Sequence, residues 1–279
     1  MTAALSPQVG EAPEPSKVHS DELLVVDGVS KTYRSSAGPV HALQNLDLVV
    51  RNQEFVSILG RSGCGKSTLL KMVAGVTPIS IGEIRIAGSR VTEPVVGLGM
   101  VFQTPVLLAW RTILSNILLP VEIRRLPRQE EYVESARRLI RMVGLAGYEQ
   151  RYPEELSGGM QQRVSICRAL ICNPTLLLMD EPFGALDALT RDEMALELLR
   201  LWQETKKTII FVTHSVEEAV LLSDRVIVMS PRPGTVSLDL PINLPRPRSG
   251  DSRYDPTFTD YCHRLRSCIY ERSSLQKKI

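Results

Sequence analysis

A glycine-rich loop that ends in a lysine and a hydroxyl residue is the clearest chemical feature of the chain. The pattern G-x-x-x-x-G-K-[ST] is matched by Gly60, Gly65, Lys66 and Ser67, between a predicted strand and a predicted helix. Glycines let such a loop curl until its backbone N–H groups point at phosphate oxygens, and the following helix adds its positive N-terminal end. Lys66 can then reach the β- and γ-phosphates, and the Ser67 hydroxyl can bind Mg²⁺. The sequence therefore predicts a site for a nucleotide and Mg²⁺ formed by Gly60, Arg61, Ser62, Gly63, Cys64, Gly65, Lys66, Ser67 and Thr68.

Two adjacent carboxylates follow a run of apolar residues further along the chain. In LLLMDEP, Asp180 ends a predicted buried strand and Glu181 comes directly after it. Beside the glycine-rich loop, Asp180 can hold Mg²⁺ through water, and Glu181 can orient or polarise an attacking water molecule. An isolated Asp-Glu pair is more often a solvated helix start, but the apolar run and the upstream loop argue against that interpretation.

A second glycine pair, in LSGGMQQR, lies between the loop and the carboxylates. Ser157, Gly158 and Gly159 stand at the start of a predicted helix, where free backbone N–H groups form an anion site. With this segment, the sequence resembles the ATPase subunits of ABC transporters over about residues 23 to 245. The resemblance implies that the second site closes on the γ-phosphate held by another ATPase domain, in a head-to-tail homodimer.

The other motifs of that family occur in the same order along the chain. Tyr33 matches the aromatic residue that stacks on adenine, and Gln103 matches the glutamine that reaches Mg²⁺ and the attacking water. Asp187 in GALD matches the D-loop, and His214 in VTH matches the switch histidine. The resemblance implies a catalytic set of Glu181, His214 and Gln103, and a metal set of Ser67, Gln103 and Asp180. Each of these residues, taken singly, has an ordinary structural interpretation. Because all of them occur in the order and at spacings compatible with the family pattern, we interpret them as functional motifs.

The elements that would position these residues alternate between strands and helices. Alternating apolar and polar residues predict short strands at 23–34 and 43–60, with breaks at Gly28 and Asn52–Gln53. A strand pair is predicted at 82–91, and further strands at 97–103, 175–180, 208–214, 224–230 and 235–242. Helical spacing predicts helices at 66–74, between 107 and 142 with divisions at Pro120 and Pro127, from just after Gly159 to about Cys172, and at 188–206. Continuous apolar runs suit strands buried on both faces of a parallel sheet. The fold class is α/β, and the resemblance implies a P-loop NTPase with a central mainly parallel sheet, an antiparallel β subdomain and an inserted α-helical subdomain.

Three segments are expected along the chain. Residues 1–21 predict a disordered leader, without the basic start or apolar core of a signal peptide. Residues 22–245 form the ATPase domain, with the helical subdomain at about 104–165. Residues 246–279 comprise a linker and an amphipathic helix, which Asp255 can cap and Pro256 can begin. The apolar face of this helix either packs on its own domain, which we favour, or docks a partner; it consists of Phe258, Tyr261, Cys262, Leu265, Cys268 and Ile269.

Composition and charge exclude several classes of protein. A formal net charge of +2 gives no general basis for binding nucleic acid. The five cysteines have no metal-ligand spacing, and their odd number suits a reducing cytosol. No uninterrupted apolar run reaches the roughly 20 residues of a membrane-spanning helix. The sequence therefore predicts a chain that does not cross a membrane by itself.

The resemblance also implies membrane partners. The segment TPVLLAWRTILSNILLP fits the family's groove for a permease, with Leu107, Leu108 and Trp110 either contacting it or packing within the subdomain. LSGGMQQRVSICRAL resembles importer subunits more than exporters, and FGALDALTR and LPRPR look most like the branch for nitrate, sulfonates and taurine. This implies a peripheral ATPase on the cytoplasmic face of the inner membrane. It would dock on a separate permease, to which an external binding protein delivers the solute.

Two alternatives stay open from the sequence. An exporter subunit would bind ATP identically but dock on a different permease. A soluble ABC-type ATPase acting in translation or on nucleic acid usually carries two cassettes or long coiled coils, and this chain shows neither, nor a strongly basic face. The identity of co-purifying chains would separate all three.

Overall fold

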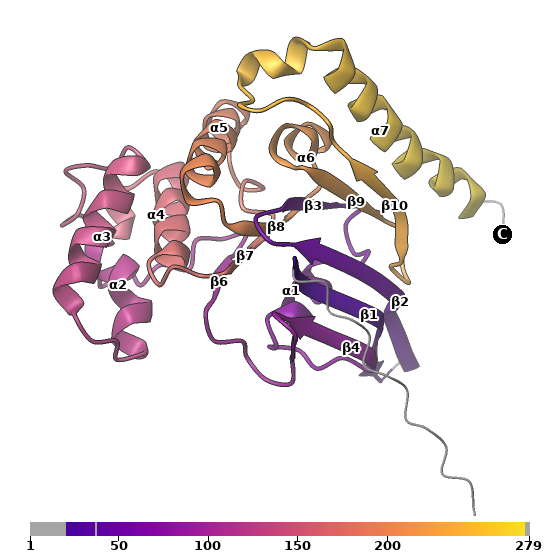
Figure 1. Ribbon diagram of the computed structural model, residues 1–279, viewed down its shortest axis with the longest axis horizontal. Helices are drawn as coiled ribbons and strands as arrows, with labels where there is room; N and C mark the ends of the chain where they lie inside the picture. The colour runs from indigo at the N-terminus through magenta and orange to yellow at the C-terminus, as the bar shows by residue number, and fades with distance from the viewer. Residues whose placement is uncertain (1–20, 37, 277–279) are drawn as a thin grey trace, which may run out of the picture.

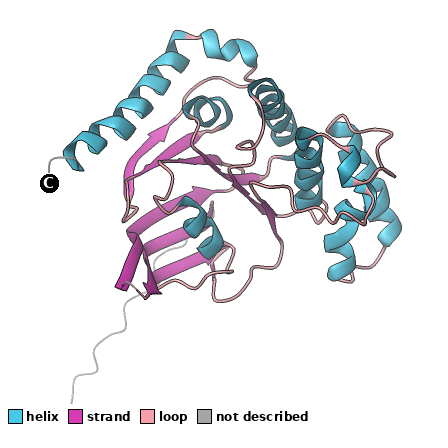
Figure 2. Ribbon diagram, turned by 180° about the vertical axis from the view of Figure 1, so that it is seen from behind, coloured by secondary structure: helices cyan, strands magenta, loops and turns pink. Residues whose placement is uncertain are grey.

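The computed structural model describes residues 21–36 and 38–276. Within these residues, the strands form one sheet of six and one of four. Figures 1 and 2 show the six-stranded sheet at the centre, the four-stranded sheet below it, and helices α2 (Ile113–Ile123), α3 (Gln129–Met142) and α4 (Gly158–Leu170) grouped at one end. The predicted leader lies outside the described residues apart from Asp21, as do residues 277–279 at the other end.

The six-stranded sheet brings the carboxyl ends of its parallel strands to one edge. In spatial order it comprises β10 (Val236–Pro241), β9 (Arg225–Met229), β3 (Phe55–Leu59), β8 (Thr208–Thr213), β7 (Leu176–Asp180) and β6 (Leu98–Val101). β9 and β10 pair antiparallel, and the other neighbours pair parallel. β8 is buried along its whole length and β7 as far as Met179, which confirms that the apolar runs at 175–180 and 208–214 are covered on both faces. β3, predicted from alternating apolar and polar residues, is buried along its whole length as well. The segments that follow β3, β7 and β8 therefore meet at this edge.

The four-stranded sheet is antiparallel. β1 (Glu22–Ser35) pairs with β2 (Gly38–Arg51) and with β4 (Ile81–Ile86), which pairs with β5 (Ser89–Arg90). The predicted break at Gly28 is wrong, because β1 continues through it with a shift in register. Gly28 takes a φ of 55° there and donates its N–H to Asp47 Oδ1 at 2.7 Å. The predicted break at Asn52–Gln53 is confirmed, since the chain passes there from β2 to β3.

Most of the predicted helices are confirmed, with shifted ends. Besides α2, α3 and α4, the confirmed helices are α1 (Lys66–Val73), α5 (Ala188–Thr205) and α7 (Pro256–Gln276). Helix α6 (Val216–Leu222) and the short 3₁₀ turns η1 (Pro153–Glu155) and η2 (Gly250–Tyr254) were not predicted. Residues 107–111 are irregular, because α2 begins only after Thr112, whose hydroxyl accepts the N–H of Ser115 at 3.3 Å. Pro120 lies inside α2, and the chain turns instead at 124–128. Among the described helices, none combines the length and apolar character needed to cross a membrane.

The C-terminal helix α7 packs on its own domain. Phe258, Tyr261, Cys262 and Leu265 are buried in the core beneath it, and Cys268 and Ile269 pack against that core. The prediction that we favoured for its apolar face is therefore confirmed. The predicted cap is also present, since Asp255 accepts the N–H of Thr257 at 2.7 Å.

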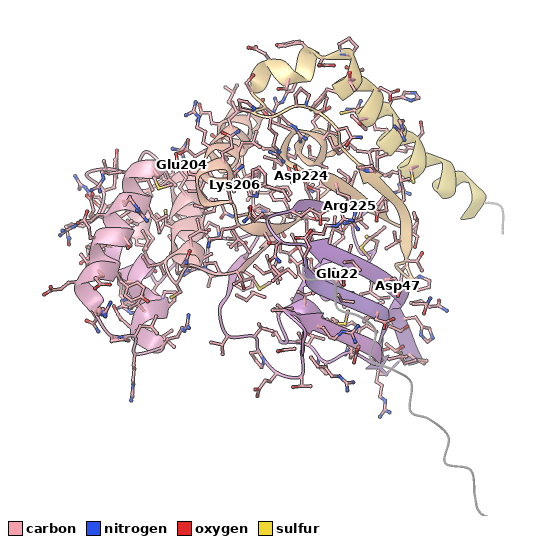
Figure 3. All side chains as sticks on the ribbon, viewed as in Figure 1. Glu22, Asp47, Glu204, Lys206, Asp224 and Arg225 are labelled. Carbon is pink, nitrogen blue, oxygen red and sulfur yellow. The ribbon has the colours of Figure 1, made fainter. Side chains whose placement is uncertain are left out.

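The segment predicted as a linker is anchored rather than free. Arg248 is buried, and its guanidinium donates hydrogen bonds to five backbone carbonyls at 2.7–3.2 Å, three of them at the end of α6. Burial lowers the pKa of Arg248 to about 10. Arg246 pairs with Asp224 at 2.7 Å, and Figure 3 labels Asp224 beside Arg225 at the junction of α6 and β9. The last carbonyls of a helix lack intrahelical partners, so Arg248 satisfies the end of α6.

Replacing Arg248 with alanine should lower the free energy of unfolding by about 3 kcal/mol, because several buried carbonyls lose their donor. Urea unfolding followed by circular dichroism measures this. Arg138→Ala, on the exposed face of α3, is the matched control and should change the free energy by less than about 0.5 kcal/mol. Equal stability of the two variants would show that Arg248 does not anchor the segment.

Candidate functional site

The glycine-rich loop joins the end of β3 to the start of α1. Gly63 and Gly65 take φ angles of 77° and 105°, in the left-handed region that favours glycine. A Cβ on Gly65 would also lie 2.6 Å from Leu43 Cδ2 and 3.0 Å from the Ala42 carbonyl oxygen. No side chain caps the first turn of α1, so its N–H groups face the loop. The local sequence therefore builds an anion cradle at the edge of the sheet.

A cavity of about 330 Å³ opens over this cradle. It is lined by Tyr33, Val40, Ala42, Ser62, Gly63, Gly65, Lys66, Ser67, Thr68, Gln103, Glu181 and Arg232. Of the predicted loop residues, Gly60, Arg61 and Cys64 do not line it. Cys64 is buried behind the loop, and burial raises the pKa of its thiol.

Lys66 connects the loop to the carboxylates. Its ammonium donates to the backbone carbonyls of Gly60 at 2.9 Å and Arg61 at 3.2 Å. The same nitrogen lies 3.4 Å from Glu181 Oε1. The side chain is only 4% exposed, so its charge is held within the protein at the cavity wall. A buried, partnered ammonium at this place is ready to pair with an anion.

Asp180 and Ser67 meet directly, as predicted for a metal site. The Ser67 hydroxyl donates to Asp180 Oδ1 at 2.9 Å. Burial raises the pKa of Asp180, and the hydrogen bond from Ser67 opposes that shift. Gln103 lines the same cavity from beyond the end of β6, which stops at Val101, two residues earlier than predicted. A hydroxyl, a carboxylate and an amide oxygen are the hard ligands that suit Mg²⁺, so these residues fit that ion.

Glu181 lies between a cation and an imidazole. Its Oε1 faces Lys66, and its Oε2 lies 3.2 Å from His214 Nδ1. The backbone of Glu181 takes a φ of 46°, and its N–H donates to the Val212 carbonyl at 2.9 Å. A positive φ at a non-glycine residue is a strained conformation that is typical of functional sites. The hydrogen bond to Val212 and the contacts with Lys66 and His214 hold this conformation, with the carboxylate at the wall of the cavity.

The far side of the cavity is formed by the four-stranded sheet. Tyr33, near the end of β1, is 39% exposed and lines the cavity together with Val40 and Ala42 of β2. The predicted adenine-stacking residue is thus brought to the loop. Sequence reasoning missed Val40, Ala42 and Arg232. Arg232 lies in SPRPG, a conspicuous turn whose position beside the loop depends on contacts far apart in the sequence.

Besides the three loop residues, six predicted site residues do not line this cavity. Asp180 and His214 contact the lining residues Ser67 and Glu181, whereas Ser157, Gly158, Gly159 and Asp187 lie elsewhere. Ser157 and Asp187 instead cap helices α4 and α5, with Met160 N–H donating to Ser157 Oγ at 3.3 Å and Thr190 N–H to Asp187 Oδ1 at 3.0 Å. The hydrogen bond from Thr190 lowers the pKa of Asp187. Gly158 and Gly159 begin α4, and a Cβ on Gly159 would lie 2.5 Å from Thr190 Cγ2. The two motifs therefore lie against each other and away from the chain's own loop.

A second cavity, of about 550 Å³, lies between β6, α2 and α4. We call it the α2 groove; its lining includes Val95, Val96, Gly97, Leu98, Gly99, Met100, Phe102, Val106, Leu108, Leu119, Pro120, Ile123, Arg124, Arg168, Ala169 and Cys172. Leu107 is half-buried against the core, whereas Trp110 is 76% exposed. Of the three predicted contact residues, only Leu108 lines the groove.

The chain is similar to several known proteins. The sequence profile described as ABC transporter matches residues 43–184. An uncharacterized ABC transporter ATP-binding protein of Methanocaldococcus jannaschii is 47% identical over 229 residues, which cover 82% of this chain and 85% of that protein. An aliphatic sulfonates import ATP-binding protein of Bacillus cereus is 43% identical, with coverage of 81% and 89%. A taurine import ATP-binding protein of Rhizobium johnstonii is 42% identical, with coverage of 91% and 99%.

A solved structure supports the same relationship. A dimeric ATP-binding cassette in a post-hydrolysis state, bound to ADP and phosphate, has a TM-score of 0.71 and 32% identity, covering 80% of this chain and 100% of that chain. The predicted fold class is thereby confirmed, since a complete ATP-binding cassette superposes on most of the chain.

Proposed function

The chain belongs to the ABC transporter family as an ATP-hydrolysing subunit, and we propose that it drives the uptake of taurine, other sulfonates or a related small solute through a separate permease. The observation that carries this proposal is the cavity in which Lys66, Ser67 and Glu181 meet beside the phosphate cradle. The import relatives support the solute class and the direction of transport. The subunit works at the cytoplasmic face of the membrane as a peripheral protein.

The motif residues in and beside the cavity have defined tasks in this proposal. The loop N–H groups and Lys66 bind the phosphates of ATP, while Tyr33 stacks on the base. Ser67, Asp180 and Gln103 hold Mg²⁺, which when bound neutralises charge on the β- and γ-phosphates. Glu181 orients the attacking water and accepts its proton. His214 keeps the carboxylate of Glu181 in place, through the contact at 3.2 Å.

A second copy of the chain completes the site. Ser157 and Gly158 are exposed and stand apart from the chain's own cavity, yet they form an anion site at the start of α4. In a head-to-tail homodimer, this site would close on the γ-phosphate bound by the partner. The dimeric form of the solved cassette supports the pairing of two copies. Hydrolysis then removes the γ-phosphate contacts, and the two copies part.

The α2 groove is the proposed binding site for the permease. It is a large cavity of mainly apolar lining, and Ile123 of α2 leaves 72% of its surface exposed there. Exposed apolar surface of this kind marks protein contacts. Phe102 lines the groove and the next residue, Gln103, lines the nucleotide cavity, so a permease segment bound in the groove would lie one residue from the nucleotide site along the chain.

Replacing Ile123 with aspartate should reduce the permease recovered with the tagged chain by at least about tenfold, because a charge would enter an apolar contact. Quantitative mass spectrometry of material from detergent-solubilised membranes measures this. Ile81→Asp is the matched control, since Ile81 is 68% exposed on β4 and does not line the groove. Both variants should bind ATP like the unmodified chain. Full recovery with Ile123→Asp would place the contact elsewhere.

The same co-purification tests the proposed function itself. A multi-spanning importer permease among the recovered chains supports the proposal. An efflux permease would reverse the direction of transport while leaving the ATPase chemistry intact. Ribosomal or DNA-repair components in place of a permease would contradict the transport role.

A further inference from the structure

The nucleotide cavity has a second cationic residue, which no motif of the sequence assigns. Arg232 lies in the turn between β9 and β10 and lines the cavity together with Lys66. Its Nη2 donates to the Gly63 carbonyl at 3.2 Å, so it touches the phosphate loop itself. Unlike Lys66, the side chain is exposed.

The turn that carries Arg232 is fixed against both walls of the cavity. Gly234 donates its N–H to the Ala42 carbonyl at 3.0 Å and accepts the N–H of Gln44 at 3.1 Å, so the turn is bonded to β2. A Cβ on Gly234 would lie only 2.1 Å from the Cys64 carbonyl oxygen of the loop. The turn is also closed on itself, because Thr235 N–H donates to Ser230 Oγ at 2.9 Å. Arg232 therefore stands on a rigid support, not on a free loop.

The charge on Arg232 is uncompensated by protein carboxylates. Lys66 is paired with Glu181, but among the described residues no carboxylate lies within ion-pair distance of Arg232. Its one hydrogen bond leaves several of the five N–H donors of the guanidinium open. An exposed fork of donors at the mouth of a phosphate cradle is suited to phosphate oxygens, which bind arginine in charge-assisted hydrogen bonds.

We propose that Arg232 is a nucleotide-binding residue, which supplies a second cation to the phosphates of ATP and ADP. The inference rests on the proposed nucleotide site and adds a binding residue to it. Arg232 acts on affinity, since among the described residues no hydrogen bond or ion pair joins it to Asp180, Glu181 or His214. It approaches the phosphates from the side of β10, and Lys66 approaches them from the start of α1.

The test is the dissociation constant for ADP and ATP, measured by titration calorimetry at two salt concentrations. We expect Arg232→Ala to raise both constants by about tenfold at low salt. Arg232→Lys keeps the charge and should stay within about threefold of the unmodified chain. Arg232→Gln keeps a donor for the Gly63 carbonyl but loses the charge, and it should bind as weakly as Arg232→Ala, with a smaller difference at high salt.

The control is Arg51→Ala, at the end of β2 and away from the cavity, which should leave both constants unchanged. The inference would be overturned if Arg232→Gln bound nucleotide as tightly as the unmodified chain while Arg232→Ala bound it weakly. That result would show that the side chain only positions Gly63 through its hydrogen bond and that its charge is not needed. Unmodified affinity in Arg232→Ala would overturn it too. If Lys66→Ala still abolishes binding in that case, the nucleotide site stands; if Lys66→Ala also binds normally, the proposed function fails.

Discussion

Replacing Glu181 with glutamine should lower the rate of ATP hydrolysis by about a thousandfold, within the range that removal of a general base produces. Glutamine has the shape of glutamate and can keep the contact with His214, but its amide cannot take a proton from water. ATP affinity should stay within about threefold, because the loop N–H groups remain and Lys66 keeps its hydrogen bonds to the carbonyls of Gly60 and Arg61. Phosphate release and nucleotide titration measure the two quantities. Normal hydrolysis by this variant would show that Glu181 does not act on the water.

The same variant should accumulate as a dimer when ATP is added. If hydrolysis is what parts the two copies, blocking it leaves the γ-phosphate between the loop of one copy and the α4 start of the other. Size-exclusion chromatography with light scattering detects this species. The control is the double variant Glu181→Gln with Ser157→Arg, which should bind ATP and stay monomeric, because the exposed Ser157 faces the partner in the proposed dimer. ATP-dependent dimers of the double variant would contradict the facing arrangement.

Replacing Lys66 with alanine should weaken ATP binding by at least about a hundredfold, since it removes a buried charge partner of the phosphates. The change also leaves Glu181 without its cation and removes the ammonium that donates to the carbonyls of Gly60 and Arg61, at 2.9 and 3.2 Å. Titration calorimetry measures the affinity, and thermal unfolding of the unliganded protein separates it from loss of the fold.

The control for Lys66 is Lys71→Ala, an exposed lysine on the same helix that does not line the cavity. It should bind ATP within about threefold of the unmodified chain. If Lys66→Ala is folded and binds ATP as well as Lys71→Ala does, the glycine-rich loop is not the phosphate site.

The parts of the site predicted from sequence are those set by local chemistry. Gly63, Gly65 and the start of α1 make a cradle within one short segment, and buried runs place Asp180 and Glu181 at the same sheet edge. Arg232 escaped prediction because the turn after β9 meets the loop through contacts with β2, more than 180 residues earlier in the chain. A local sequence pattern cannot predict a contact between segments so far apart in the chain.

The errors in the predicted fold have similar physical causes. Gly28 and Pro120 are local breakers, yet the Asp47 carboxylate stabilises a bulge at the first, and packing of α2 in the helical subdomain tolerates the second. The polar, proline-rich residues around Arg248 have the composition of a linker. The buried Arg248 guanidinium donates to five carbonyls and so fixes that segment in place between α6 and α7.

The most direct test of the central claim is solute uptake by cells that lack the chain and receive either the unmodified form or Glu181→Gln. Radiolabelled taurine, an alkanesulfonate and nitrate are supplied in turn, and the membrane content of each form is checked by immunoblot. We predict that the unmodified chain restores uptake of at least one of these solutes and that Glu181→Gln, present at the same level, restores none. Uptake that is equal with the unmodified chain, with Glu181→Gln and with no chain would contradict the account.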